Sequence, residues 1–120
     1  MNYNLKGTGV VITDELRTYI EKKLAHADKL LAGDTVAHTD VELEYAPVLD
    51  GGRYRAEFTV TASGAMYRTE QWGTTLHEAI DIAVDEAIKD IRRSKKKHLR
   101  LVRHGATVAK DVLRGLRKKF

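Results

Sequence analysis

Apolar residues recur along this chain with two different periods, and the period predicts where each structural element lies. Residues 2–6 alternate with a period of two, which predicts a short first strand. Over residues 14–31 apolar side chains recur at three- and four-residue steps, which indicates an amphipathic helix. Thr13 is the predicted N-cap of this helix, and Gly33 is its predicted stop.

The period returns to two in the middle of the chain. Residues 36–47 alternate and predict a second strand, and residues 54–62 predict a third. The glycine-containing sequence at 50–53 predicts a turn between them. Gly64 marks a second reversal, after which residues 65–72 predict a fourth strand whose inward face the pattern leaves open.

A second helix follows the strands. Residues 75–78 read Thr-Leu-His-Glu, a capping-box pattern that predicts the start of a helix. An apolar stripe continues from there to Ile91. We expect the helix to end in the basic run that comes next, at residues 92–98, because cations suit the negative end of a helix dipole.

Residues 99–120 are expected to form a basic C-terminal extension beyond a domain at residues 1–98. Apolar residues recur in the extension at four-residue spacing among basic ones, but an isolated helix containing Gly115 would be only marginally stable in water. The apolar stripe could pack back on its own domain, dock against a protein partner or lie on an anionic bilayer. The sequence leaves these three alternatives open.

The order of the elements predicts an α+β fold of the type β-α-β-β-β-α. We expect one four-stranded sheet with both helices on one face. The first two strands should be parallel if they are neighbours, and the other neighbouring pairs antiparallel. The second face of the sheet should then remain exposed to solvent.

Length and composition limit the classes of protein to consider. A chain of 120 residues is long enough for one compact domain. It has no cysteine, which excludes disulfides and zinc–thiolate sites, and no apolar run approaches the roughly 18 residues of a membrane span. The N-terminal residues do not resemble a secretory signal, so we expect a cytoplasmic protein.

Basic and acidic residues are separated along the chain. Residues 1–91 hold nine Lys and Arg against sixteen Asp and Glu, a net charge of −7, whereas residues 92–120 hold twelve Lys and Arg against Asp111 alone, a net charge of +11. Repulsion within such a cation cluster is relieved by a polyanion. Nucleic acid is therefore the favoured partner class, and an anionic membrane surface is the alternative.

The residues offer little for catalysis. Ser63 and Ser94 are the only serines, neither lies in a nucleophile motif, and the five histidines form no metal-ligand spacing. We therefore expect no enzymatic activity, no cofactor and no small-molecule substrate.

Two groups of carboxylates are candidate sites. One strand face carries three carboxylates, a possible cation site, although a solvated sheet face is the plainer interpretation. Those residues are Asp40, Glu42 and Glu44. Asp81 and Asp85 lie four residues apart on the second helix and could share a proton, but exposed like charges are again the plainer interpretation.

Two segments resemble the ribosome hibernation-promoting factors, also called ribosome-associated inhibitors or sigma-factor modulation proteins, and the resemblance covers residues 2–98. The first segment contains Ile12-Thr13, Leu16-Arg17, Tyr19-Ile20 and Lys23-Leu24, and the second contains Ala79-Ile80-Asp81 and Arg92-Arg93-x-Lys95. The resemblance implies a fold related to double-stranded-RNA-binding domains. It also implies binding to the small ribosomal subunit, where the protein occupies space needed by messenger and transfer RNA and holds the ribosome inactive.

The resemblance, together with the basic stretch that follows it, supplies the candidate contacts to ribosomal RNA. They are Lys22, Lys23, Lys29, Lys89, Arg92, Arg93, Lys95, Lys96, Lys97, Arg100 and Arg103. Glu86 and Asp90 stand where the family usually has Lys and Gln, which argues against RNA contact along the middle of the second helix. With 22 residues after position 98, we expect the short type of factor. A membrane-surface protein anchored by the basic C-terminal segment is the alternative function.

Overall fold

The fold is α+β, with the predicted order of elements. The computed structural model describes residues 2–31, 36–47, 53–62 and 64–119, and side chains as far as residue 97. The elements are β1 (Asn2–Thr8), α1 (Asp14–Leu30), β2 (His38–Ala46), β3 (Arg53–Ala62), β4 (Ala65–Gly73) and α2 (Leu76–Lys119).

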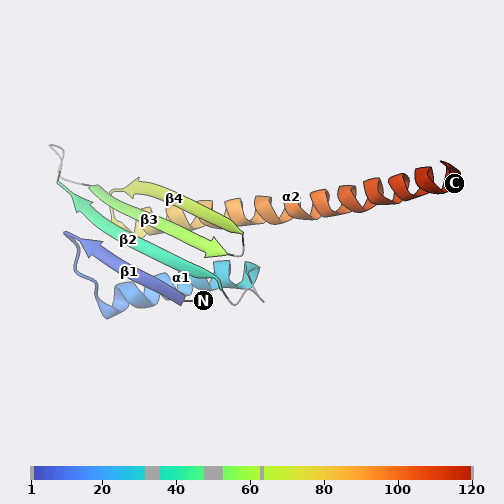
Figure 1. The fold of residues 1–120 in the computed structure, drawn as a ribbon. Helices are drawn as coiled ribbons and strands as arrows, with labels where there is room; N and C mark the ends of the chain where they lie inside the picture. Colours follow the sequence, from blue (N-terminus) through green and yellow to red (C-terminus); the bar gives the residue numbers. More distant parts are fainter. Residues whose placement is uncertain (1, 32–35, 48–52, 63, 120) are drawn as a thin grey trace.

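The four strands form one sheet in the order β1-β2-β3-β4. β1 and β2 are parallel, and the other two neighbouring pairs are antiparallel, as predicted. Both helices lie against the same face of the sheet (Figure 1). The opposite face is left uncovered by either helix, which confirms the two-layer arrangement.

The core lies between the sheet and the two helices. Ile20 of α1, Phe58 of β3 and Ile80 of α2 are fully buried and belong to one apolar cluster. A second cluster contains Val60 and Ile91 and joins β3 to α2 just before the basic run at residues 92–98. Burial of one face of each strand follows directly from the alternation in the sequence.

The inward face of β4, which the pattern left open, is set by contacts with α2. The Thr69 hydroxyl donates a hydrogen bond to the Ala83 carbonyl at 2.9 Å, and the Tyr67 hydroxyl donates to Ser94 Oγ at 2.8 Å. The odd-numbered residues of β4 therefore face the helix.

The predicted helix starts are confirmed, with one difference. Thr13 Oγ1 accepts from the Leu16 amide at 3.1 Å, and Thr75 Oγ1 accepts from the Glu78 amide at 3.1 Å. The Glu78 carboxylate accepts from the Thr74 hydroxyl, so the capping box is not reciprocal. Gly64 has the positive φ that its reversal requires. The predicted stop at Gly33 and the glycines of the predicted turn at 50–53 lie outside the described residues.

The predicted end of the second helix is wrong. α2 does not end in the basic run but continues as one helix to Lys119, and this gives the molecule a length of 74 Å against 30 Å and 16 Å in the other directions (Figure 1). The part of α2 that packs on the sheet supplies the costly nucleus, and each further residue extends the helix at small cost. The proposed division of the chain after residue 98 therefore falls within one helix. In the described part of the chain no helix is both long and apolar enough to cross a bilayer.

Candidate nucleic-acid interface

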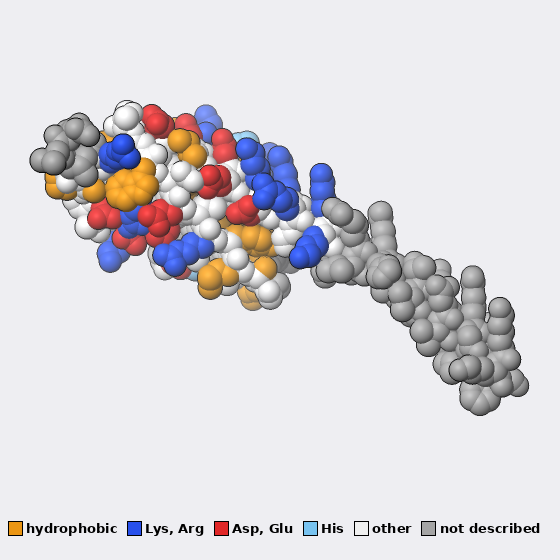
Figure 2. All heavy atoms as spheres, turned by 90° about the horizontal axis from the view of Figure 1, so that it is seen from above, with side chains coloured by type: hydrophobic (Ala, Val, Ile, Leu, Met, Phe, Trp, Pro, Cys, Tyr) orange, Lys and Arg blue, Asp and Glu red, His pale blue; other side chains and the backbone are white. Residues whose placement is uncertain are grey.

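The basic side chains predicted to contact RNA gather on the two helices. Three candidates, Lys22, Lys23 and Lys29, lie on α1. Lys89 and the candidates from Arg92 to Lys97 lie on α2. Of these residues, all but Lys23 are exposed. The two sets meet where the end of α1 contacts α2, because Lys95 of α2 reaches the carbonyl of Leu30. Figure 2 shows Lys and Arg side chains gathered toward the end of the body where the described side chains of α2 end.

Most of these cations have no acidic partner. Within the described residues, six candidate side chains have neither a carboxylate within ion-pair distance nor a hydrogen bond to another part of the protein; Lys95 also lacks a carboxylate but contacts the Leu30 carbonyl. These six, the unpaired cations, are Lys22, Lys29, Lys89, Arg92, Lys96 and Lys97. Their positive charge is therefore available to an external anion such as a phosphate group.

Lys23 differs from the unpaired cations because it joins the two helices. Its Nζ lies 3.1 Å from Oδ1 of Asp81 on α2 and 5.5 Å from the centre of the Tyr19 ring. The hydrogen bond to Asp81 raises the pKa of Lys23. Burial raises the pKa of Asp81, but its hydrogen bonds with Tyr19 and Lys23 outweigh burial and lower it. Both groups are therefore charged near neutral pH, and the charge of Lys23 is largely balanced within the protein.

Acidic residues along α2 also have partners inside the molecule. Glu86 accepts a hydrogen bond from Gln71 Nε2 of β4 at 2.6 Å, and Asp90 lies 3.8 Å from Arg93. Arg93 is highly exposed, so this pair contributes little and leaves Arg93 able to turn to another anion. Glu86 is directed at the sheet, which reduces its repulsion of an RNA backbone.

Lys95 has a structural contact that its neighbours lack. Its Nζ donates a hydrogen bond to the carbonyl of Leu30, one of the last carbonyls of α1 that has no partner within that helix. Arg100 and Arg103 also belong to α2, but their side chains lie outside the described part of the chain.

Substitution of Lys95 by methionine is expected to affect stability more than substitution of Lys96 does. Loss of the contact with Leu30 should lower the free energy of unfolding by about 1 kcal/mol, whereas Lys96→Met should change it by less than about 0.5 kcal/mol. Urea denaturation followed by circular dichroism measures both values. Equal stability of the two variants would contradict a structural role for Lys95.

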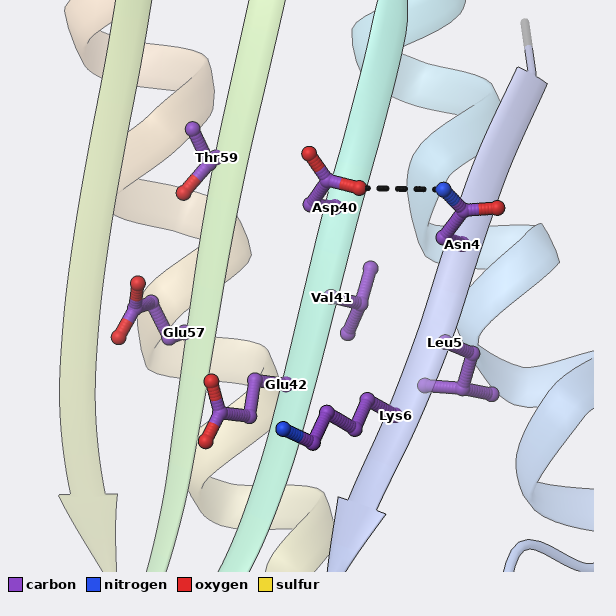
Figure 3. Close-up of a pocket in the computed structure, with 8 residues that line it drawn as sticks. All are labelled: Asn4, Leu5, Lys6, Asp40, Val41, Glu42, Glu57 and Thr59. Carbon is purple, nitrogen blue, oxygen red and sulfur yellow. Dashed lines mark hydrogen bonds between the residues drawn. The ribbon is translucent and has the colours of Figure 1, made fainter.

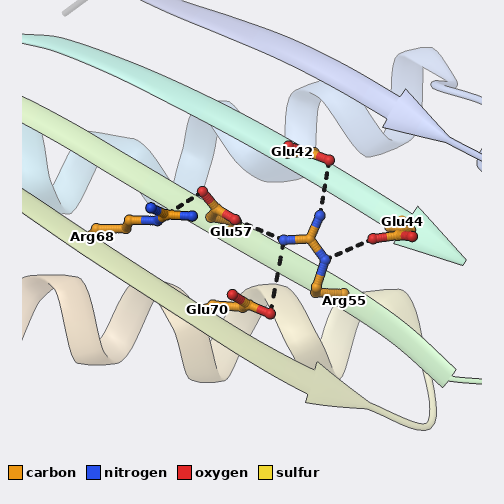
Figure 4. Close-up of polar contacts among 6 residues, drawn as sticks. All are labelled: Glu42, Glu44, Arg55, Glu57, Arg68 and Glu70. Carbon is orange, nitrogen blue, oxygen red and sulfur yellow. Dashed lines mark hydrogen bonds and ion pairs between the residues drawn. The ribbon is translucent and has the colours of Figure 1, made fainter. Parts of the chain in front are cut away.

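The uncovered face of the sheet is organised around Arg55. Its guanidinium donates to Glu42 at 2.8 Å, to Glu44 at 2.8 Å and to Glu57 at 2.7 Å (Figure 4). Burial lowers the pKa of Arg55, but the hydrogen bonds to Glu44 and Glu57 raise it by more, so it stays charged. Glu70 lies 3.9 Å away and adds a fourth carboxylate.

The cation site considered for this face is not formed. Asp40 contacts His38 at 3.1 Å and Asn4 at 3.3 Å, and its carboxylate turns toward Asn4 and lies apart from Glu42 and Glu57 (Figure 3). No group of three or more possible ligands within the described residues could hold a metal ion. Arg55 already occupies the space between Glu42 and Glu44, so these carboxylates are not free to hold a metal ion.

Sequence reasoning missed the contacts that join distant segments. It assigned Asp81 an exposed position near Asp85, but the Tyr19 hydroxyl donates to Asp81 from 62 residues away. The alternation predicts Arg55 only as one of several polar residues on a solvent-exposed face. The alternation of β2 and β3 places Glu42, Glu44, Arg55 and Glu57 on one face, but the pairing of the strands decides which of them meet. No short-range pattern signals the contact between Tyr19 and Asp81.

The family described as Sigma 54 modulation protein / S30EA ribosomal protein matches residues 3–99. A ribosome hibernation promotion factor of Picosynechococcus sp. is 27% identical over 116 residues, covering 94% of this chain and 58% of that protein. One from Bacillus subtilis is 25% identical over 97 residues, covering 81% of this chain and 50% of that protein. The chain thus spans about half the length of the curated relatives it matches.

Solved structures show the same fold. The N-terminal domain of Protein Y from Thermus thermophilus superimposes with a TM-score of 0.69 at 37% identity, covering 78% of this chain and 98% of that domain. A ribosomal subunit interface protein from Coxiella burnetii shares the fold, with a TM-score of 0.67 at 15% identity over 80% of this chain and 99% of that one. By its sequence match and its fold, the chain belongs to the Sigma 54 modulation protein / S30EA ribosomal protein family.

Proposed function

We propose that this protein regulates translation by binding the small ribosomal subunit through ribosomal RNA. The observation that carries the proposal is the set of unpaired cations on α1 and α2, in a chain whose relatives are named ribosome hibernation promotion factors. The two faces of the molecule differ in their exposed charge, and this difference supports contact with RNA through the helices. The helices expose six cations without partners, whereas on the sheet Arg55 is enclosed by carboxylates and Arg68 is paired with Glu57, which leaves only Lys6 and Arg53 as exposed cations without an ion pair among the described sheet residues.

In this proposal the protein acts by occupying space. Bound between the subunit's RNA elements, it prevents messenger and transfer RNA from entering and so holds the ribosome inactive. The contacts are among the residues predicted from the sequence on α1 and α2, and the unpaired cations contribute most. We expect the protein to be present where ribosomes are, in the cytoplasm.

The strength of such binding should depend steeply on salt. If all six unpaired cations contact phosphates, the plot of log affinity against log salt concentration has a slope of about −5, by the rule for duplex nucleic acid. Between 50 and 200 mM salt this corresponds to a loss of about 10³-fold in affinity.

Sedimentation through a sucrose gradient tests the proposal. The protein is mixed with purified small subunits, large subunits or whole ribosomes at several salt concentrations, with and without messenger RNA and transfer RNA. We expect co-sedimentation with small subunits that decreases with salt and with both RNAs. Binding whose strength does not change with salt concentration would refute the electrostatic contact, and binding unaffected by messenger and transfer RNA would refute the block of their sites.

Flotation with anionic vesicles tests the membrane alternative, which no described contact favours.

A further inference from the structure

Asp81 is an acidic residue of α2 that lies against the basic side chains of α1. Its Oδ1 accepts a hydrogen bond from the Tyr19 hydroxyl and lies 3.1 Å from Lys23 Nζ, so α2 holds two side chains of α1 through one carboxylate. The ring of His77 packs edge-on against Tyr19, with 4.5 Å between ring centres. We call Tyr19, Lys23, His77 and Asp81 the interhelical joint.

The interhelical joint reduces the charge available to RNA. An Asp on this surface repels phosphate, and its pairing with Lys23 balances one of the candidate cations. An RNA-binding surface would gain affinity from the loss of Asp81 if charge alone mattered. The carboxylate must therefore contribute something else if it supports binding.

That contribution is the relative position of the helices. The interhelical joint connects α1 to the early part of α2, and the Lys95 side chain connects the end of α1 to a later part of α2. Two attachments at different points along both helices fix one helix axis against the other. Lys22 and Lys29 of α1 are thereby held at a constant distance from the unpaired cations of α2.

We propose that Asp81 is a positioning residue: by holding Tyr19 and Lys23, it keeps the cations of α1 and α2 on one rigid surface that contacts a single RNA backbone. Lys23 is then an anchor rather than an RNA contact. This inference rests on the function proposed above.

Asp81→Ala separates positioning from charge, because the two explanations predict changes of opposite sign. If Asp81 positions α1, the variant loses the contacts of Lys22 and Lys29, and the salt slope becomes shallower by roughly two. If Asp81 only balances charge, the variant frees Lys23, and the slope becomes steeper by roughly one. The measurement is co-sedimentation of the full chain with purified small subunits between 50 and 200 mM KCl.

Asp85→Ala is the matched control. Asp85 lies one turn further along α2, is exposed and has no ion pair within the described residues, so its removal changes the net charge by the same amount. We expect its salt slope to equal that of the wild type. A loss of stability alone would leave the slope of the folded protein unchanged, so the slope distinguishes positioning from a purely structural role.

Tyr19→Phe provides a second test that changes no charge. It removes one hydrogen bond of the interhelical joint, and we expect a shallower slope and an affinity reduced about threefold. Tyr3→Phe is its control, since the Tyr3 hydroxyl donates to Glu21 at 2.6 Å and joins β1 to α1 instead of joining the helices. We expect Tyr3→Phe to bind like the wild type. Tyr19→Phe decides the question if Asp81→Ala does not fold.

The outcomes separate this inference from the proposed function. Wild-type protein that does not bind small subunits refutes both. Wild-type binding with an unchanged or steeper slope for Asp81→Ala refutes the positioning role and leaves the proposed function intact. A shallower slope for Asp81→Ala and Tyr19→Phe, with both controls unchanged, supports the inference.

Discussion

Replacing both Lys96 and Lys97 by glutamate is expected to weaken binding to small ribosomal subunits on the order of 50-fold at 0.1 M salt. Both side chains are exposed and belong to the unpaired cations, so nothing in the described part of the protein competes for them. Each phosphate contact contributes about 0.9 to the logarithm of the affinity for every tenfold decrease in salt concentration below 1 M. At 0.1 M salt, the loss of two contacts therefore lowers the logarithm of the affinity by about 1.8. Repulsion by the new carboxylates adds to the loss. Co-sedimentation over a range of protein concentrations measures it.

The control variant makes the same change in charge on the sheet. Lys6→Glu/Arg53→Glu alters two exposed cations of β1 and β3, on elements that carry none of the predicted contacts. We expect its affinity to fall by no more than about threefold, through the long-range effect of net charge. If the two double variants lose affinity equally, RNA contact is not localised on the helices.

Replacing Arg55 by alanine is expected to lower the free energy of unfolding by about 2 kcal/mol. The guanidinium is only 11% exposed, and its removal leaves the carboxylates of Glu42, Glu44 and Glu57 close together without a cation. Loss of one partner from a fully buried ion pair costs about 3–5 kcal/mol, and the partial exposure of these carboxylates reduces that cost. Urea denaturation at neutral pH measures the change.

Two further variants identify the source of this effect. Arg68 contacts Glu57 at 3.0 Å but is 65% exposed, so Arg68→Ala should cost less than about 1 kcal/mol. Adding Glu44→Gln to Arg55→Ala should recover part of the lost stability, because it removes one of the carboxylates left without a cation. An Arg55→Ala protein as stable as the wild type would show that the ion pairs of Arg55 contribute nothing to stability.

Folded Arg55→Ala should bind small subunits normally, since the proposed contacts lie on the opposite side of the sheet.

The alternation of side chains predicted the sheet well. Val41 and Leu43 of β2, and Phe58 of β3, are buried on the helix side as the period of two required. This worked because the side-chain period of a strand fixes which residues share a face, whatever the neighbouring strands are. For β4 the alternation was weak, and contacts of Tyr67 and Thr69 with α2 decided its facing.

The extent of α2 could not be predicted from local propensity. Residues beyond 98 would form only a marginal helix alone, but in the protein they continue a helix whose first turns are packed on the sheet. The cost of nucleation has been met elsewhere in the chain. A prediction made segment by segment does not include that contribution.

The sequence by itself determined the order of the elements, the buried face of β2 and β3, and the concentration of basic residues after Ile91, because periodicity and charge are local properties of the chain. Only the tertiary structure decided which charges are free. Lys23 and Lys95 look like their neighbours in the sequence, but Asp81 and Leu30 lie across the helix interface and bind them. Arg55 likewise gained its carboxylates from three different strands. An ion pair depends on distances of a few ångströms between segments far apart in the chain, and packing of the helices and strands sets those distances.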